Sequence, residues 1–190
     1  MSAFTLNKSG NPPMKPSLFC LIDLQEKLVP AMGDRAEALI ARSAKALQAA
    51  RLLQLPVVLT EQYPKGLGRT IAAIVEHAQG LPLLEKTSFS AFGAPGFEEL
   101  LLQNRTRHLV IAGIEAHVCV RQTCLDALSR GIEVSLLADC TESRSVRDRD
   151  LAWRELENKG VEILSFEAWA FAALRDAKHP AFKAVSALVR

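Results

Sequence analysis

Short apolar runs alternate along the chain with longer stretches in which apolar residues recur at helical spacing. Several of the short runs, such as HLVIA at 108–112, are apolar at every position instead of at every second one. A strand of this kind is buried on both faces, which is typical of a parallel sheet covered by helices. The runs that predict strands are 17–24, 56–60, 83–85, 108–112, 132–138 and 161–164.

Helices are predicted between these strands from apolar spacing and from residues that start or stop a helix. Asp34, followed three residues later by Glu37, forms a capping-box pattern. Gly131 and Gly160 stand where helices end. The alternation predicts an α/β protein with three layers, α/β/α, around a doubly wound, mostly parallel six-stranded sheet of the Rossmann-like kind. The predicted helices are 34–54, 70–77, 95–103, 118–130, 146–159, 167–177 and 180–189.

Length and composition fit a polar N-terminal tail, 1–16, followed by a single domain, 17–190. The chain has 190 residues, of which 49% are hydrophobic, so one full core is expected. A net charge of +2 gives no basic excess for nucleic acid, and no apolar run is long enough to span a membrane. With no secretion signal and four cysteines without a zinc or redox pattern, we expect a cytoplasmic protein with free thiols.

Three residues with chemical potential stand at the ends of predicted strands. Asp23 closes the first strand, Lys86 follows the third, and Cys119 follows the fourth at the first turn of a helix. The carboxyl ends of parallel strands meet at one edge, so these side chains should converge. A thiol, a proton acceptor and a cation are what nucleophilic attack on a carbonyl needs, and a helix N-terminus lowers the pKa of a thiol. Taken singly, each residue also fits a structural role as packing, a turn cap or a solvated lysine.

Three segments carry a family resemblance. FCLIDLQEKL, LLEKTSFSAF and VIAGIEAHVCVRQTCLDAL resemble the Asp, Lys and Cys motifs of the isochorismatase-like cysteine hydrolases, in order and without a large insertion. This superfamily includes nicotinamidases, N-carbamoylsarcosine amidases and isochorismatases. The stretches TEQYPKGLG at 60–68 and GIEAHVCV at 113–120 are most similar to its isochorismatase-domain-containing branch. The resemblance runs from about residue 17 to about residue 167 and implies the isochorismatase-like hydrolase fold.

The resemblance assigns roles to the residues at the strand ends. Asp23 would take the thiol proton and return it to the leaving group, and Lys86 would keep Asp23 ionised. Cys119 would attack the substrate and form an acyl-enzyme. The family also has a non-proline cis peptide bond just before the cysteine, which corresponds to Ile114–Glu115. The backbone N–H groups of Glu115 and Cys119 would then form the oxyanion hole.

The same resemblance suggests pocket residues and two departures. Gln62 falls where isochorismatase-type members place a substrate-contacting glutamine, and Tyr63 and His117 are further candidates for the substrate pocket. Ala116 stands where many members have threonine. Glu61 has no histidine near it, so the metal site of nicotinamidases is incomplete, because a catalytic zinc needs about three protein ligands. We therefore expect no metal and no cofactor.

The leading functional prediction is a metal-independent cysteine hydrolase, with an Asp–Lys–Cys triad, that cleaves a small amide, imide or ester, with a C–N bond as the expected target. One alternative is an isochorismatase-type vinyl-ether hydrolase, in which Asp23 protonates the substrate and no thiol is needed. A second is a non-catalytic binding protein on the same fold, although the triad residues are all present. We expect a small-molecule substrate and a homo-oligomer, either a dimer or a larger assembly.

Overall fold

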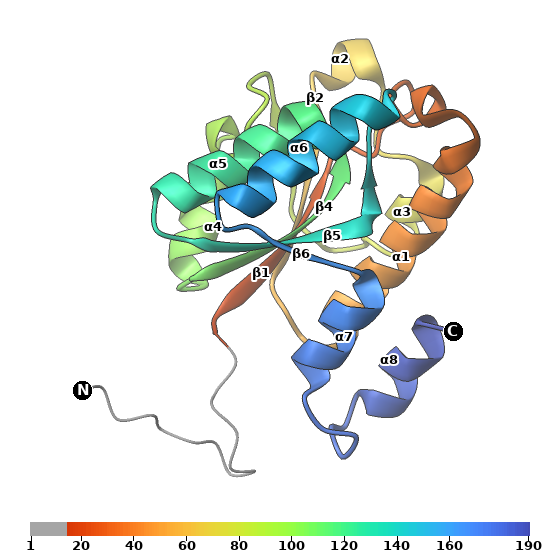
Figure 1. Ribbon diagram of the computed structural model, residues 1–190, viewed down its shortest axis with the longest axis vertical. Helices are drawn as coiled ribbons and strands as arrows, with labels where there is room; N and C mark the ends of the chain where they lie inside the picture. Colours follow the sequence, from red (N-terminus) through yellow and green to blue (C-terminus); the bar gives the residue numbers. More distant parts are fainter. Residues whose placement is uncertain (1–14) are drawn as a thin grey trace.

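The computed structural model describes residues 15–190, so positions 1–14 of the predicted tail lie outside the described residues. Six strands form one sheet in the order β3-β2-β1-β4-β5-β6, and every neighbouring pair is parallel (Figure 1). The predicted six-stranded parallel sheet is thereby confirmed. The strands are β1 (Ser17–Ile22), β2 (Val57–Gln62), β3 (Leu83–Lys86), β4 (His108–Ile114), β5 (Glu133–Glu142) and β6 (Glu162–Leu164).

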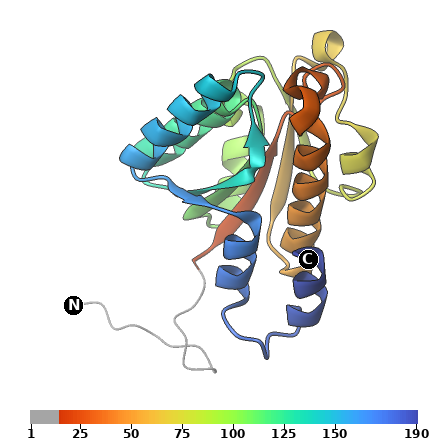
Figure 2. The same cartoon turned by 45° about the vertical axis from the view of Figure 1, so that its right-hand side comes forward.

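Helices cover both faces of the sheet, which gives the predicted three layers. Helices α5 and α6 lie on one face, and α1 lies on the other with α7 and α8 below it (Figures 1 and 2). Within residues 15–190, no helix has the length and apolar character that a bilayer span requires. The helices are α1 (Ala36–Leu52), α2 (Pro64–Leu67), α3 (Ala72–Val75), α4 (Phe97–Gln103), α5 (Arg121–Ser129), α6 (Val146–Asn158), α7 (Phe166–Leu174) and α8 (Phe182–Leu188), with short turns η1 (Val29–Arg35), η2 (Ala91–Gly93) and η3 (Ala116–Val120).

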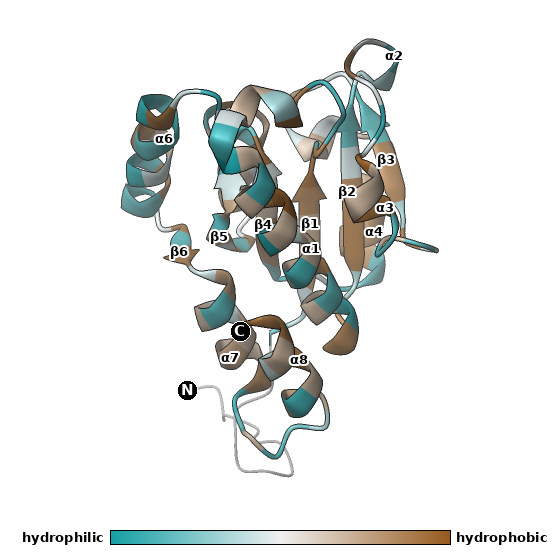
Figure 3. Cartoon of the chain, turned by 90° about the vertical axis from the view of Figure 1, so that its right-hand side faces the viewer, coloured by the Kyte–Doolittle hydropathy of each residue, from teal (hydrophilic) through white to brown (hydrophobic). Residues whose placement is uncertain are grey.

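The central strand β1 separates two apolar cores. Phe19 and Leu21 point into the core under α1, α3, α7 and α8, whereas Leu18, Cys20 and Ile22 point into the core under α4, α5 and α6. All five side chains are at most 1% exposed. Figure 3 shows the matching hydrophobic colour along β1 and β2. An all-apolar sequence therefore forms a strand here because both of its faces are covered.

The start of α1 differs from the capping-box prediction. The 3-10 turn η1 runs directly into the helix, whose N-cap is Arg35, and no side chain caps it. Asp34 lies inside η1 with its side chain 94% exposed. Arg35 instead donates from Nε to the Glu142 carboxylate at 3.1 Å. The prediction that Asp34 caps the helix is wrong, because helical turns precede the position where a cap was expected.

The direction in which the chain crosses the sheet changes between β1 and β4. From β1 the chain continues through α1 to β2 on one side, while β4 pairs with the other side of β1. In sheets wound this way, the carboxyl ends of the strands diverge at that point and leave room for a ligand. Asp23 directly follows β1, Lys86 ends β3, and Cys119 lies in η3 directly after β4. The fold therefore brings all three to the same edge of the sheet.

Candidate active site

Asp23 is the buried anion at the centre of this edge. Its backbone φ of 53° lies in the left-handed region, which aspartate tolerates better than most residues. Its side chain has no exposed surface. The Oδ1 atom accepts a hydrogen bond from Thr60 Oγ1 at 2.7 Å, and Oδ2 accepts one from Lys86 Nζ at 2.7 Å. Both carboxylate oxygens therefore have a donor, as a buried charge requires.

Lys86 reaches Asp23 from two strands away. It ends β3, where it stands in register with Gln62 of β2, and β2 separates it from β1. Its ammonium donates to Asp23 Oδ2 and, at 2.8 Å, to Gln62 Oε1. Its side chain also has no exposed surface. The long aliphatic chain of Lys86 crosses the end of β2, so its ammonium reaches the carboxylate of Asp23. The pairing of the two charges offsets the free-energy cost of burying them.

Cys119 lies beside this ion pair. It belongs to η3, a five-residue π-helical turn that leads into α5, and it is 5% exposed. Its Sγ lies 4.0 Å from Gln62 Oε1. Asp23 and Lys86 are the two charged side chains that act on the thiol. The structure therefore places the three candidate catalytic residues together, with Gln62 between the cation and the thiol.

The ionisation of Cys119 differs from the prediction. Burial, together with the negative charge of Asp23, raises the pKa of the thiol to about 12, although the positive charge of Lys86 opposes this. The prediction that the helix N-terminus lowers the pKa of this thiol is therefore wrong for the resting protein, because desolvation of the thiolate outweighs the favourable charges. At neutral pH the thiol is protonated, so its activation requires a group that accepts its proton.

Two threonines contribute contacts that the sequence reasoning missed. Thr60 bonds to the carboxylate of Asp23, and Thr123 donates from Oγ1 to the backbone oxygen of Cys119 at 2.7 Å. Thr123 Oγ1 also accepts from the Ala91 backbone N–H at 3.0 Å, which connects η2 to the cysteine turn. Thr60 is aligned with Ile22, so pairing the two predicted strands in parallel register would have identified it. Thr123 offers no such signal, because it lies within a helix, where polar and apolar residues alternate along the sequence.

The segment after β4 has the backbone geometry that the resemblance implies. The peptide bond between Ile114 and Glu115 is cis. The Glu115 side chain is nearly buried and pairs with Arg144 through both the guanidinium and the backbone N–H of that residue. His117 bonds through Nδ1 to Ser143 Oγ at 2.9 Å. The structure thus gives the His117 ring a partner in the loop after β5.

The other two pocket candidates have different surroundings. Gln62 is 9% exposed, and its amide is used internally: Oε1 accepts from Lys86, and Nε2 donates to the Thr87 carbonyl at 2.8 Å. Its contacts therefore position Lys86. Tyr63 is 53% exposed. Tyr63, Lys86 and Thr87 line a cavity of about 380 Å³ together with Pro95. Tyr63 thus forms a wall of an open cavity next to the ion pair.

Glu61, the carboxylate nearest to the nicotinamidase-type metal position, already has three donors. It accepts from the Thr70 backbone N–H at 2.6 Å, from Thr70 Oγ1 at 2.8 Å and from Arg69 Nη1 at 2.9 Å. Burial alone would raise its pKa, but these bonds outweigh it and lower the pKa of Glu61. Among residues 15–190 there is no group of three or more His, Cys, Asp or Glu side chains that could hold a metal ion.

Comparisons with known proteins point to one family. The isochorismatase domain model matches residues 17–168. Isochorismatase domain-containing protein 2 of Danio rerio is 38% identical over 180 residues, covering 95% of this chain and 90% of that protein. The structure of MAR1 ribonuclease from Caenorhabditis elegans is 37% identical with a TM-score of 0.86, covering 93% of this chain and 91% of that one.

A more distant structure shares the fold. The YcaC gene product of Escherichia coli, an octameric hydrolase of unknown specificity, is 19% identical with a TM-score of 0.85. The match covers 92% of this chain and 88% of that chain. At this level of identity the similarity shows only that the two chains have the same architecture.

Proposed function

The chain belongs to the isochorismatase family, and we propose that it is a cysteine hydrolase that cleaves a small amide, imide or ester through an acyl-enzyme. The observation that carries this proposal is the fully buried Lys86–Asp23 ion pair beside the Cys119 thiol. A buried ion pair contributes little net stability compared with apolar packing, whereas charged groups clustered in a crevice are typical of catalytic sites.

Asp23 acts as the general base in the first half of the reaction. The resting thiol is protonated, because its pKa is raised to about 12. As Sγ attacks the substrate carbonyl carbon, the thiol proton passes to the Asp23 carboxylate. Lys86 stays protonated and stabilises the negative charge that moves from Asp23 to sulfur during this transfer. A C–S bond forms, and the carbonyl oxygen becomes an oxyanion.

The backbone N–H groups of Glu115 and Cys119 are the donors we assign to that oxyanion. Collapse of the tetrahedral intermediate breaks the bond to the leaving group, which takes the proton from Asp23. Water then attacks the thioester, Asp23 accepts a proton from it, and the thiol is regenerated as the acid product leaves. Each proton that Asp23 accepts is returned, so Asp23 and Cys119 end the cycle unchanged.

The burial of the site favours a small substrate. Cys119 is only 5% exposed and the side chains of Asp23 and Lys86 have no exposed surface, so a bulky substrate would not reach the thiol. Ala116, where many family members have threonine, removes one hydroxyl from the sequence around the nucleophile. We therefore expect the substrate to be recognised mainly through its shape and its carbonyl group.

A vinyl-ether hydrolase is the alternative that the family name itself favours. In that reaction Asp23 would donate a proton to the substrate, and Cys119 would be dispensable. In the sequence, this alternative is supported by Gln62, which stands where isochorismatase-type members place a substrate-contacting glutamine. In the structure both ends of the Gln62 amide have internal partners, which favours a role in holding Lys86.

The Caenorhabditis elegans relative carries the name of a ribonuclease, so RNA has to be considered as a substrate. Binding RNA requires a cationic surface that follows the phosphates, whereas this chain has a net charge of +2 and its triad lysine has no exposed side-chain surface. We propose that RNA is not cleaved. We also propose that the chain forms a homo-oligomer, as the octameric YcaC protein does.

An activity screen with matched cysteine variants tests the proposed function. Small amides, imides, esters, vinyl ethers and a single-stranded RNA are incubated with the wild type, Cys119→Ala and Cys124→Ala. We expect turnover of a carbonyl compound that Cys119→Ala lowers at least 10⁴-fold, since the nucleophile is lost. Cys124→Ala should keep most of it, and dialysis against EDTA should leave it unchanged. Undiminished turnover in Cys119→Ala would exclude the covalent mechanism, and vinyl-ether cleavage by that variant would establish the alternative.

A further inference from the structure

A second cavity, of about 780 Å³, lies at the opposite edge of the sheet from the triad. Pro16, Arg107 and Ile132 line it, and these residues directly precede β1, β4 and β5. The remaining walls come from the end of α4, the end of α5 and the turn η2. The cavity therefore opens at the amino ends of the strands, while the triad occupies their carboxyl ends.

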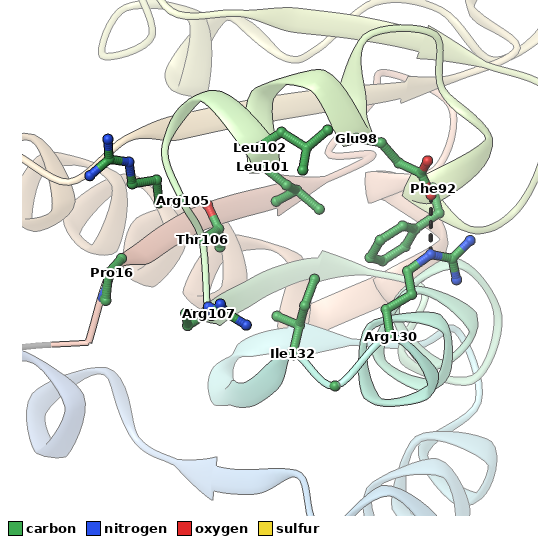
Figure 4. Close-up of a pocket in the computed structure, with 11 residues that line it drawn as sticks. Pro16, Phe92, Glu98, Leu101, Leu102, Arg105, Thr106, Arg107, Arg130 and Ile132 are labelled. Atoms are coloured by element: carbon green, nitrogen blue, oxygen red, sulfur yellow. Dashed lines mark hydrogen bonds and ion pairs between the residues drawn. The ribbon is translucent and has the colours of Figure 1, made fainter. Parts of the chain in front are cut away.

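The middle of this cavity is apolar. Leu101 is 6% exposed and Ile132 is half-buried, and both face the cavity between its two ends (Figure 4). Leu102, at the rim, is 78% exposed, which makes it the most exposed of the large apolar side chains among the described residues. An open cavity with apolar walls of this size can hold a small organic molecule, since ligand pockets measure roughly 300–1,000 Å³.

One end of the cavity carries unpaired positive charge. Arg105 and Arg107 are exposed, and neither has an ion-pair partner among residues 15–190. Arg130, at the other end, is already engaged: it pairs with Glu98 at 3.1 Å and stacks on the Phe92 ring at 4.3 Å (Figure 4). The positive charge available to a ligand is therefore concentrated at the Arg105 end.

Thr106, between these two arginines, has an unsatisfied hydroxyl. The residue is 8% exposed, and its Oγ1 has no hydrogen-bond partner within the described part of the chain. Its backbone N–H, in contrast, bonds to the Leu101 carbonyl at 2.9 Å. Because the oxygen itself has almost no exposed surface, a ligand in the cavity does not reach it, and Thr106 contributes only to the shape of the cavity wall.

We propose that this cavity binds a small amphiphilic anion, an apolar chain or ring that carries a carboxylate or a phosphate. Arg105 and Arg107 hold the anionic head, because guanidinium groups match the geometry of carboxylate and phosphate. Leu101 and Ile132 contact the apolar part. The site is independent of the triad and does not rest on the proposed hydrolase activity.

Calorimetric titration of the full chain with three probes of equal chain length tests this proposal. Decanoate supplies a carboxylate, decyl phosphate supplies a phosphate, and decanol supplies the same chain without charge. We expect one site for at least one of the two anions, with decanol binding at least tenfold more weakly. Which anion binds more tightly identifies the head group that the site prefers.

One variant and two controls assign the binding to this cavity. Arg107→Glu should weaken binding of the preferred anion at least tenfold, whereas Arg154→Glu, which makes the same charge change at an exposed position on α6, should not. Thr106→Val keeps the shape of the cavity wall and should leave both binding and thermal stability unchanged, because the hydroxyl it removes is buried and has no partner within the described residues.

Several results would overturn the proposal. They are the absence of binding by both anions, equal binding of decanol and decanoate, and equal effects of Arg107→Glu and Arg154→Glu. An interface between two copies of the chain is the competing explanation for the exposed Leu102. If Leu102→Glu dissociates an oligomer in sedimentation and neither anion binds the wild type, the cavity belongs to that interface and the proposal fails.

Discussion

Both carboxylate oxygens of Asp23 accept hydrogen bonds from buried donors, so the carboxylate is held in one orientation. Thr60 holds Oδ1 and Lys86 holds Oδ2, while Gln62 fixes the lysine from its other side. The carboxylate is thus fixed in position before substrate arrives, and the ammonium offsets its burial.

Replacing Lys86 by methionine tests the role of that ammonium. Lys86→Met keeps an apolar side chain of similar length but removes the charge. We expect kcat/KM to fall at least about 100-fold and the acidic limb of the pH–rate profile to move to higher pH, because the charge that favours ionised Asp23 is gone. Folding should be largely retained, since Asp23 can then take up a proton.

The matched control is Lys159→Met, which removes the charge of an exposed lysine that follows α6. It should leave both the rate and the pH profile unchanged. Equal activity of the two variants would contradict the assignment of Lys86 to the catalytic machinery.

At the residue scale, the sequence predicted which side chains meet but not how they ionise. Asp23 and Lys86 were predictable because they are polar residues at the ends of apolar strands, where the fold rule brings them together. The ionisation of Cys119 was predicted wrongly, because its burial depends on how η3 packs against the sheet. The internal contacts of Gln62 were also missed, since its side-chain partners Lys86 and Thr87 lie at the end of β3, which is distant in the sequence.

At the scale of elements, the approach of β4 to β1 shapes the edge of the sheet next to Asp23. Gly113 of β4 has a φ of +117°, and a Cβ atom there would lie 2.0 Å from the Ile22 carbonyl oxygen. No side chain fits that gap, so glycine is required for the two strands to pair up to their carboxyl ends. The pairing in turn keeps Asp23, the residue after Ile22, beside η3.

Gly113→Ala should therefore be severely destabilising, by at least about 4 kcal/mol, because backbone would have to move against backbone. The control is Gly80→Ala, where φ is also positive at +75° but no atom lies within 4 Å of the added Cβ. That substitution should cost only about 1 kcal/mol. Urea denaturation of both variants gives the two free energies of unfolding. If the free energies of unfolding of the two variants lie within about 1 kcal/mol of each other, the close approach of β1 and β4 does not require glycine at position 113.

Sequence patterns predicted the order and type of the elements better than their ends. The apolar runs identified all six strands, although the edge strands β3 and β6 are only partly buried. The predicted helix start at Asp34 was wrong, because η1 continues directly into α1. The π-helical turn η3 was not predicted either. Helical and π-helical turns share nearly the same apolar spacing, so only the hydrogen bonds of the backbone distinguish them.

At the scale of the whole molecule, four buried thiols make the stability of the fold sensitive to alkaline pH. Burial raises the pKa of Cys119 to about 12 and raises the pKa values of Cys20, Cys124 and Cys140 well above the ordinary value of 9.0. In the unfolded chain these thiols ionise near pH 9. The stabilisation is therefore complete below pH 9 and is lost as the pH rises above it, because only the unfolded chain then releases the protons.

The free energy of unfolding should fall by up to about 1.4 kcal/mol per pH unit for each such thiol above pH 9. Urea denaturation between pH 8 and pH 10.5 measures this slope. Groups other than thiols also ionise at alkaline pH, so Cys140→Ala provides the comparison. It should reduce the slope by the contribution of one thiol. A slope that Cys140→Ala leaves unchanged would show that this buried thiol is not the titrating group.

The two edges of the sheet carry different chemistry in this molecule. The carboxyl edge holds the buried ion pair and the thiol, and the amino edge holds an open cavity with exposed arginines. The sequence predicted the first because strand ends can be aligned from the apolar pattern. It could not predict the second, since that cavity forms between the ends of α4 and α5, and the gap between two helices is set by packing.

The central claim, that the ion pair of Asp23 and Lys86 activates Cys119, is tested most directly by mapping iodoacetamide labelling of the intact protein at pH 7.5 by peptide mass spectrometry. Of the four thiols, Cys119 is 5% exposed and the other three are fully buried. We expect that Cys119 is labelled first and that Lys86→Met, which removes the positive charge that lowers the pKa of this thiol, slows its labelling at least tenfold without slowing that of Cys140. Labelling of Cys119 at the same rate in both proteins, or no faster than that of Cys140, would contradict it.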